Sequence, residues 1–218
     1  MTLQNRVTPF GEIIATHARG LFMGNRGRLH DEHRTLRRQH SSEKRWLVCN
    51  IQFRERKRTP MSPGQYTELF FLDEATALAA GHRPCAECRN ADYRRFKEFW
   101  VGANRERIKD TANGGVVSAE QIDGVLQTER MSADRTKRRF RSTCKELPDG
   151  VLITPDECPD AYLIWKNSLY HWTPGGYDDR RPLQRPATVE VLTPRSIVRT
   201  IAAGYVPIVH STAEGATG

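Results

Sequence analysis

The chain has 218 residues, of which 38% are hydrophobic and 28% charged, and its formal net charge is +8. This length supports one domain, or one domain with a small appendage, around a buried core. The sequence lacks a run of about 18 apolar residues, and its N-terminus lacks the apolar segment of a signal peptide, so we expect neither a membrane span nor export. Five cysteines are an odd number for a secreted disulfide framework, which favours a reducing, cytoplasmic setting.

The positive charge is concentrated near the N-terminus. Residues 19–58 contain twelve Lys or Arg and four Asp or Glu, so twelve minus four gives a local net charge of +8. A concentration of one sign of charge is the expected footprint of a polyanionic partner, although it also fits an ordinary solvated face.

The first predicted elements are two short strands, at residues 10–16 and 21–23, followed by the turn Gly-Asn-Arg-Gly-Arg at 24–28. Glycine permits close approach of the backbone to another molecule, and arginine suits phosphate or a base edge. This turn is therefore either a nucleic-acid contact, in which Asn25 reads a base, or a plain polar loop.

Two longer strands follow. Residues 46–53 alternate in polarity, which predicts a strand with Cys49 on its interior face. The aromatic stretch 66–72 predicts a second strand that pairs with the first. Glu68 lies within this stretch, and if it is buried it needs a partner or a raised pKa.

A tight cysteine turn lies between two predicted helices. Asp73 can cap the first helix, Gly81 is placed just beyond its end, and Asn90 can cap the second helix. Cys85 and Cys88 form a Cys-x-x-Cys pair between them. Redox pairs of this kind usually follow a strand directly, whereas this one follows a helix and a turn, so we favour a metal site.

The stretch from Phe70 to Cys88 resembles the zinc-binding module of the Ada-type DNA alkylation-repair proteins. The matching residues are Phe70-Phe71, Asp73-Glu74-Ala75 and Ala79-Ala80-Gly81-His82-Arg83-Pro84-Cys85-Ala86-Glu87-Cys88. They correspond to an aromatic strand, a short Ala-rich helix and a Gly-aromatic-Arg-Pro-Cys-x-x-Cys turn. The resemblance covers about a fifth of the chain and implies a zinc ion whose thiolate ligands lie beside a DNA phosphate.

The ligand set implied by the resemblance departs from that of the family. Cys49 stands for the first member of the family's earlier Cys-x-x-x-Cys pair, but Phe53 occupies the position of the second. The methyl-accepting thiol chemistry of the family is therefore not carried over. Three thiolates remain, from Cys49, Cys85 and Cys88, and because zinc takes four ligands we expect a histidine to complete the set.

Two histidines precede Cys49. His40 lies in a charged connector, whereas His30 is followed by Asp31, which could orient the imidazole, so we select His30 as the fourth ligand. The alternative is that three buried thiols meet no metal. On the zinc hypothesis the partner is DNA, and neither a membrane nor an obligate protein partner is expected. The candidate DNA contacts are Arg26, Arg28, Arg54, Lys57, Arg58 and Arg83.

The remainder of the chain predicts a helix and a β-rich unit. Ser118 and Gln121 form a capping box that opens a helix. The basic segment 130–141 is either a second phosphate-contacting arm or a solvated loop, and Pro194 starts a last helix. No internal repeat is apparent. Strand candidates are residues 161–165, 169–172 and 188–192.

These elements predict an α+β fold, in which a small zinc-stabilised sheet with flanking helices precedes a smaller β-rich part that ends in a helix. The expected units are an Ada-like, zinc-containing, DNA-binding domain at 1–110, a helical basic connector at 111–145, and a small β unit with a C-terminal helix at 146–218.

The sequence contains no P-loop, Rossmann glycine pattern, Gly-x-Ser-x-Gly elbow or His-Glu-x-x-His motif, and no paired acidic ligands for the magnesium of a nuclease. One carboxylate beside a DNA-binding cleft suffices for base excision, because the oxocarbenium-like transition state needs nearby negative charge. We therefore predict a DNA glycosylase for modified or foreign DNA, with Asn25 in the base pocket, Asp31 at the sugar and Glu68 as the other candidate carboxylate. The alternatives are a non-catalytic zinc-stabilised DNA-binding module and a metal-dependent nuclease that uses His30, His33 and Asp31.

Overall fold

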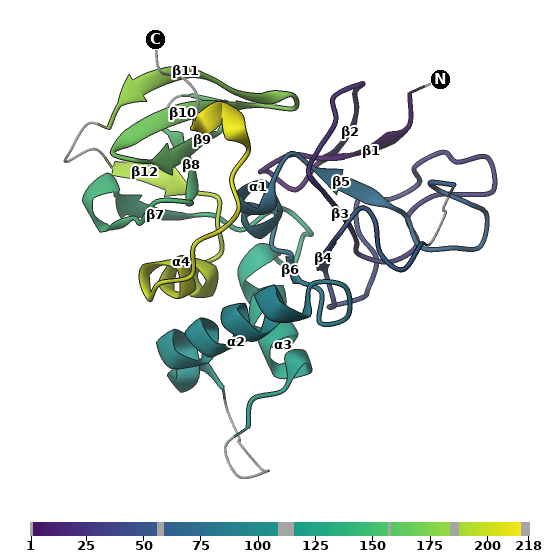
Figure 1. Ribbon diagram of the computed structural model, residues 1–218, viewed down its shortest axis with the longest axis horizontal. Coiled ribbons are helices and arrows are strands. Elements are labelled where there is room, and N and C mark those ends of the chain that lie inside the picture. Colours follow the sequence, from purple (N-terminus) through teal and green to yellow (C-terminus); the bar gives the residue numbers. More distant parts are fainter. Residues whose placement is uncertain (1, 56–58, 109–115, 157, 184–187, 215–218) are drawn as a thin grey trace.

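The computed structural model describes residues 2–55, 59–108, 116–156, 158–183 and 188–214 (Figure 1). These residues form two six-stranded sheets and four α-helices, which confirms the predicted α+β class. None of the described helices combines the length and the hydropathy needed to cross a membrane. The helices are α1 (Glu74–Ala79), α2 (Asn90–Asn104), α3 (Ala119–Arg130) and α4 (Arg195–Ala202).

The N-terminal sheet has β3 at its centre, and the strand order is β2-β1-β5-β3-β4-β6. Met23 of β3 lies opposite Cys49 of β4 on one side and Phe70 of β5 on the other. The predicted pairing of residues 46–53 with 66–72 is therefore wrong, because β3 lies between those strands. A Cβ atom on Gly24 would lie 2.0 Å from the carbonyl oxygen of Leu47, so only glycine allows this close approach. The strands are β1 (Gln4–Val7), β2 (Ile13–Ala15), β3 (Phe22–Asn25), β4 (Leu47–Cys49), β5 (Leu69–Phe71) and β6 (Arg83–Pro84).

The C-terminal sheet is antiparallel throughout, in the order β11-β10-β9-β8-β12-β7. The predicted strands at 161–165, 169–172 and 188–192 are present as β9, β10 and β12. Lys166 and Asn167, both at positive φ, form the tight turn between β9 and β10. The strands are β7 (Phe140–Thr143), β8 (Leu152–Pro155), β9 (Tyr162–Trp165), β10 (Ser168–Thr173), β11 (Gly176–Pro182) and β12 (Thr188–Val191).

Helix α1 lies at the junction of the two sheets (Figure 1). As predicted, Asp73 caps it by accepting a hydrogen bond from the backbone N–H of Thr76, and Gly81 follows its end at a φ of +88°. All six residues of the helix are buried. Ala75 and Ala79 pack against strands of the C-terminal sheet, whereas other residues of α1 pack against the N-terminal sheet. Small side chains let one short helix contact both sheets.

Two carboxylates at the start of α1 hold the C-terminal segment. Asp73 accepts hydrogen bonds from the Tyr177 hydroxyl at 2.8 Å and from the backbone N–H of His210 at 3.0 Å. Glu74 accepts from the Tyr205 hydroxyl at 2.7 Å and from the backbone N–H of Ile208 at 2.9 Å. Burial raises the pKa of Asp73 above its usual range, although these bonds favour the ionised form. The chain from 205 to 210 is therefore fixed to the N-terminal half.

The largest core contains side chains from all three predicted units. It joins Leu78 of α1, Trp100 of α2, Leu126 of α3, Ile164 of β9 and Ile197 of α4. The boundaries predicted at 110 and 145 therefore do not mark breaks in the hydrophobic packing.

The predicted N-terminal cap is present in α3 but not in α2. The predicted capping box of Ser118 and Gln121 is present at the start of α3. In contrast, the cap residue of α2 is Arg89, and Asn90 is the first helical residue. The Asn90 side chain instead donates a hydrogen bond to the carbonyl of Ala86.

Candidate metal centre and its surroundings

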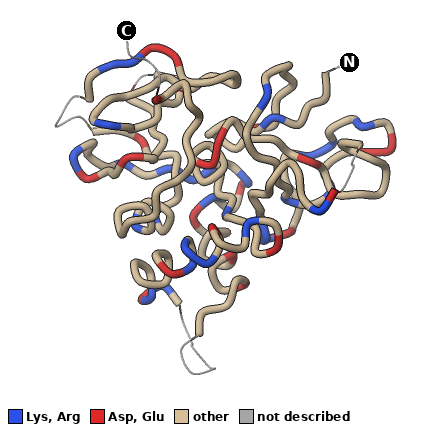
Figure 2. The backbone as a smooth tube through the Cα atoms, in the orientation of Figure 1, with Lys and Arg blue, Asp and Glu red and all other residues tan. Residues whose placement is uncertain are grey.

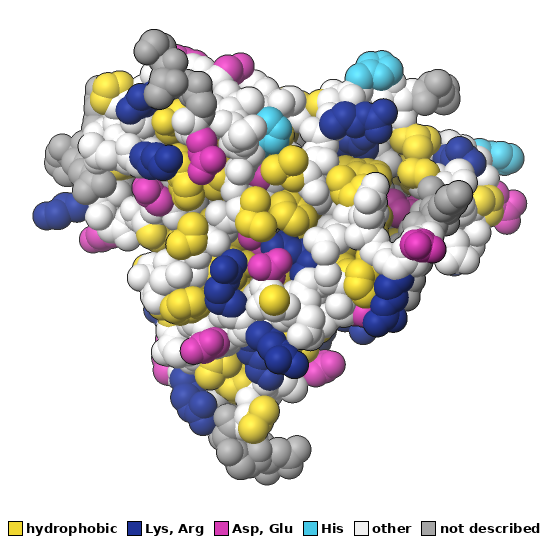
Figure 3. All heavy atoms as spheres, viewed as in Figure 1, with side chains coloured by type: hydrophobic (Ala, Val, Ile, Leu, Met, Phe, Trp, Pro, Cys, Tyr) yellow, Lys and Arg dark blue, Asp and Glu magenta, His cyan; other side chains and the backbone are white. Residues whose placement is uncertain are grey.

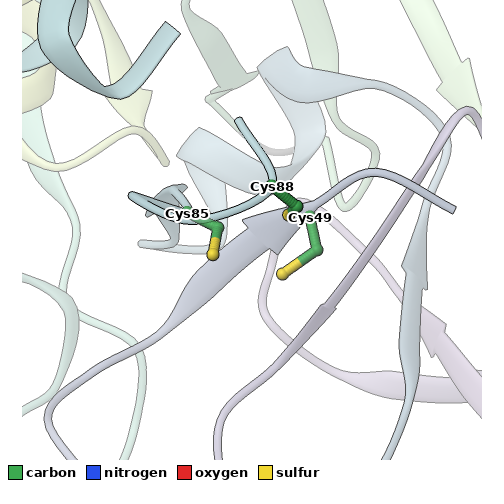
Figure 4. A group of neighbouring side chains, drawn as sticks. All are labelled: Cys49, Cys85 and Cys88. Carbon is green, nitrogen blue, oxygen red and sulfur yellow. The ribbon is translucent and has the colours of Figure 1, made fainter. Parts of the chain in front are cut away.

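The three predicted cysteine ligands lie together. Because β4 and β6 pair in parallel, Cys49 at the end of β4 is a neighbour of Cys85, the residue after β6. The Cys85 N–H donates to the carbonyl of Val48 at 2.9 Å. Cys88 returns to the same point through a tight turn. The three Sγ atoms lie within 4.8 Å of one another and converge from the strand and the turn (Figure 4).

Hydrogen bonds to sulfur favour charged thiolates in this cluster. The Cys49 thiol donates to Cys85, and the backbone N–H groups of Glu87 and Cys88 donate to the same sulfur, which lowers the pKa of Cys85 to about 5. The pKa of Cys88 is also lowered, first by Cys49 and then by the backbone N–H of Asn50. The pKa of Cys49 is raised, because its proton is shared with the other two sulfurs. Negative charge is thus favoured on Cys85 and Cys88, and it would stabilise a cation placed among the three sulfurs.

The donor set fits a thiophilic metal ion. Thiolates bound at about 2.3 Å to a tetrahedral zinc ion lie about 3.8 Å apart, so small side-chain rotations would bring these sulfurs onto one ion. Backbone N–H groups directed at the sulfurs are the outer-shell support that thiolate ligands require. Cys49, Cys85 and Cys88 are therefore confirmed as a group that can hold a metal ion.

The histidine chosen as the fourth ligand does not join the cluster. His30 is buried, its Nε2 lies 3.1 Å from the carbonyl of Ser62, and its Nδ1 lies 2.7 Å from Thr67 Oγ1. A carbonyl can only accept, so Nε2 carries the proton and Nδ1 accepts from the Thr67 hydroxyl. Both ring nitrogens are engaged, and the selection of His30 is wrong. His40 is also outside the cluster, since its ring faces Trp46 at 6.4 Å between ring centroids.

A pocket of about 170 Å³ opens beside the cysteines. Its lining includes the three cysteines together with polar and aromatic side chains from β3 and the neighbouring loops. The polar and aromatic residues of the lining are Asn25, Asn50, Phe53, Tyr66 and Glu87. The sequence pointed to Asn25 as a base reader, and the structure places it in a pocket, next to the metal centre.

Two buried ion pairs hold the cysteine turn. Arg83 forms two bonds with Asp123 of α3, at 2.8 and 2.7 Å, and both side chains are almost fully buried. Arg89 lies 2.9 Å from Glu74, stacks on the ring of Phe22, and is likewise buried. Arg83 was predicted to contact DNA, but its guanidinium is committed to Asp123, so that prediction is wrong.

Asp31 is occupied by hydrogen bonds within its own turn. Oδ1 accepts from the N–H groups of His33 and Thr35, both at 2.9 Å, and Oδ2 accepts from Arg37 Nε at 2.7 Å. The Thr35 N–H is the largest cause of a lowered pKa for this carboxyl. Asp31 also lines a different depression from Asn25. The structure therefore does not bring the two predicted excision residues into one site.

The remaining predicted residues have varied positions. Glu68 is buried and accepts a hydrogen bond from the N–H of Met61 at 2.7 Å, which supplies the partner that its burial requires. Arg28 is exposed, and Arg54 is exposed beside Glu87. Lys57 and Arg58 lie outside the described residues.

Arg26 is buried rather than displayed for DNA. It is 1% exposed, its guanidinium stacks on Trp46 at 4.7 Å, and Nη2 donates to the carbonyl of Gly11. Burial lowers its pKa to about 9. The prediction that Arg26 contacts the DNA backbone is therefore wrong, because its guanidinium does not reach the surface.

The structure contains two similar basic hairpins, the second of which lies within segment 130–141, predicted as either a phosphate-contacting arm or a solvated loop. Arg-Thr-x-Arg-Arg occurs at 34–38 and again at 135–139. In both, the first arginine has a positive φ, 60° and 64°, and a backbone bridge closes the turn, between His30 and Leu36 and between Met131 and Lys137. The two copies of this five-residue pattern begin 101 positions apart in the sequence. Basic residues are spread over many parts of the backbone (Figure 2), so charge alone does not single out these hairpins.

Comparisons with protein-family models, with curated proteins and with solved structures find no match. The functional assignment therefore depends on the chemistry of the sites alone.

Proposed function

We propose that this chain is a zinc-containing DNA-binding protein. The observation that carries the proposal is the pair of Arg-Thr-x-Arg-Arg hairpins. Each presents an exposed arginine at its tip, Arg34 or Arg135, and further exposed arginines on its returning strand. The two tips share a backbone conformation as well as a sequence pattern, which supports a common role for them.

Charge supports DNA as the partner. Phosphate contacts by arginine account for most of the affinity in sequence-independent DNA binding. On the face shown in Figure 3, basic and acidic side chains are interspersed, so the net charge of the protein does not by itself define a binding surface. The local excess of arginine on the two hairpins defines the proposed binding surface.

In this scheme the metal organises the fold. The thiolates of Cys49, Cys85 and Cys88 would hold a zinc ion between β4 and the start of α2, and such a site would stabilise the attachment of the N-terminal sheet to the helices. A ligand other than these three thiolates would complete the site.

Fluorescence anisotropy with a labelled duplex tests the proposal. Affinity should fall steeply with salt, and each lost phosphate contact should flatten the plot of log K against log salt by about 0.9. We expect the double variants Arg34→Ala/Arg38→Ala and Arg135→Ala/Arg138→Ala to flatten it. The matched control, Arg94→Ala/Lys145→Ala, removes two exposed charges elsewhere and should leave the slope unchanged. Absence of duplex binding at low salt refutes the proposal.

Base excision is a second candidate, favoured by the pocket beside Asn25. Its volume of about 170 Å³ suits a flipped base, and Phe53 and Tyr66 line it as stacking partners. Glu87 is the carboxylate of that pocket. We propose that Asn25 reads the base and that Glu87, rather than Asp31, serves the developing sugar cation.

The test is the appearance of abasic sites, which break DNA only after alkali or heat. Glu87→Gln should abolish them and Glu98→Gln, a change on the exposed face of α2, should not. If no modified or unmodified duplex yields alkali-labile sites, excision is excluded while DNA binding stands. Breaks that appear without alkali and only with added divalent metal would support the nuclease instead.

A further inference from the structure

A pocket of about 390 Å³ lies between the two halves of the chain, away from the cysteines. Its lining combines the loop after β1, the connector before β4, the end of α3 and the second basic hairpin. The charged and aromatic residues of the lining are Glu12, Arg26, His40, Trp46, Arg130, Arg135, Lys137 and Arg139. Five carry a guanidinium or an ammonium group, and one is acidic.

Two of these cations are buried on one aromatic ring. The guanidinium groups of Arg26 and Arg130 lie over the Trp46 ring, at 4.7 and 4.1 Å from its centroid. Each is 1% exposed. The two groups are held mainly by carbonyl oxygens and an amide, from Gly11 for one and from Gly81, Lys44 and Gln127 for the other. Neither has a carboxylate within ion-pair distance among the described residues.

One donor in this group lacks a partner. The Nε of Arg26 is buried and makes no hydrogen bond within the part of the chain that the structure describes. A buried guanidinium without a counter-charge is costly, and a buried donor without an acceptor adds to that cost. Proteins keep such groups when a ligand supplies the missing charge and acceptor.

Lys137 adds a third cation to the same pocket. Its ammonium group donates to the carbonyl of Ala79, which leaves further N–H groups for a ligand. Burial, together with the charges of Arg139, Arg26 and Arg130, lowers its pKa to about 7. Glu12, His40 and Arg135 also face this pocket. Binding of an anion would reduce the repulsion between Lys137 and the neighbouring arginines.

We propose that the pocket lined by Arg26, Arg130 and Lys137 binds a phosphate monoester. Three cations around one pocket match a dianion better than the single charge of a backbone phosphodiester, and the volume accommodates a nucleotide. The group is either a free phosphate ester or the terminal phosphate of a nucleic-acid strand.

Calorimetric titration of the zinc-loaded full chain with orthophosphate, adenosine 5′-monophosphate and adenosine tests this site. The first two should bind and adenosine should not. Lys137→Gln should weaken binding by about tenfold or more, because it removes a charge-assisted bond. Lys145→Gln, an exposed lysine outside the pocket, should bind like the wild type. Arg135→Gln, at the exposed rim, provides a second variant and should weaken binding by a smaller factor.

A 5′-phosphorylated oligonucleotide and its 5′-hydroxyl counterpart distinguish the sources. If the phosphorylated strand binds more tightly, and the difference vanishes in Lys137→Gln, the ligand is a strand end. If the mononucleotide binds and the two strands do not differ, the ligand is a free ester. The inference is overturned if no phosphate species binds to the wild type, or if Lys137→Gln binds them equally well. Because orthophosphate is a probe, this outcome does not depend on whether the hairpins bind duplex DNA.

Discussion

Replacing Asp123 by alanine would leave the guanidinium of Arg83 buried without a counter-charge. The two side chains are 2% and 5% exposed and are joined by two bonds, at 2.8 and 2.7 Å. Removing one partner from such a buried pair costs about 3–5 kcal/mol. In a protein of this size each kcal/mol lowers the Tm by about 2–4 °C, so we expect a decrease of roughly 10 °C.

Thermal unfolding followed by circular dichroism measures this shift, at constant zinc and protein concentration. The control is Asp156→Ala, which breaks an ion pair with Arg141 whose side chains are 47% and 59% exposed. Exposed pairs contribute little, so that variant should unfold with the wild type. The double variant Arg83→Met/Asp123→Ala should recover part of the loss, because it removes the unpaired charge as well.

Two results would contradict this reasoning. A shift for Asp123→Ala no larger than that for Asp156→Ala would mean that Arg83 is not held by the pair. A loss of DNA affinity in Arg83→Met without a loss of stability would restore Arg83 to the DNA-contacting surface.

Three further predictions concern the metal, a turn and a lysine. Cys85→Ser should reduce the zinc content from about one ion per chain and lower the Tm, because metal binding and folding are coupled. Elemental analysis measures the zinc content, with Cys158→Ser as the control outside the cluster. Full retention of zinc by Cys85→Ser would argue against the site. Asp31→Asn should destabilise the protein at neutral pH but not at strongly acidic pH, because the lowered pKa of Asp31 contributes stability that is lost as pH falls through it; equal unfolding curves at neutral pH would show that its hydrogen bonds are unimportant. In phosphate-free buffer, the free energy of unfolding should increase with pH above about 7, and the increase should be larger for the wild type than for Lys137→Gln. The reason is that the unfolded chain, with a lysine pKa of 10.5, still holds a proton that the folded chain has released. Parallel pH profiles for the two proteins would mean that Lys137 titrates normally.

Local features of the fold were readable from the sequence. The cap of α1 by Asp73, the glycine that ends it, and the capping box of α3 each depend on residues within one helical turn. The cysteine turn could also be recognised, because the spacing of Cys85 and Cys88 is local and typical of metal sites.

Long-range features were not readable in the same way. The insertion of β3 between β5 and β4 depends on non-local pairing that the alternating pattern of residues 46–53 does not encode. The burial of Arg26 depends on its stacking on Trp46 and on its hydrogen bond to a carbonyl in the loop after β1. The sequence around His30 suggested a metal ligand, but both of its ring nitrogens are hydrogen-bonded, one to Thr67 and the other to Ser62.

The binding of the C-terminal segment to α1 has a consequence for synthesis of the chain. Asp73 and Glu74 obtain their partners His210 and Ile208 from 137 and 134 residues further along. While the ribosome is still making the second half, these carboxylates at the centre of the molecule lack the hydrogen bonds that permit their burial. Contacts of such sequence separation slow folding. We therefore expect nascent chains that stop before residue 205 to remain protease-sensitive, and native structure to form only when the last strands and the segment after α4 have emerged.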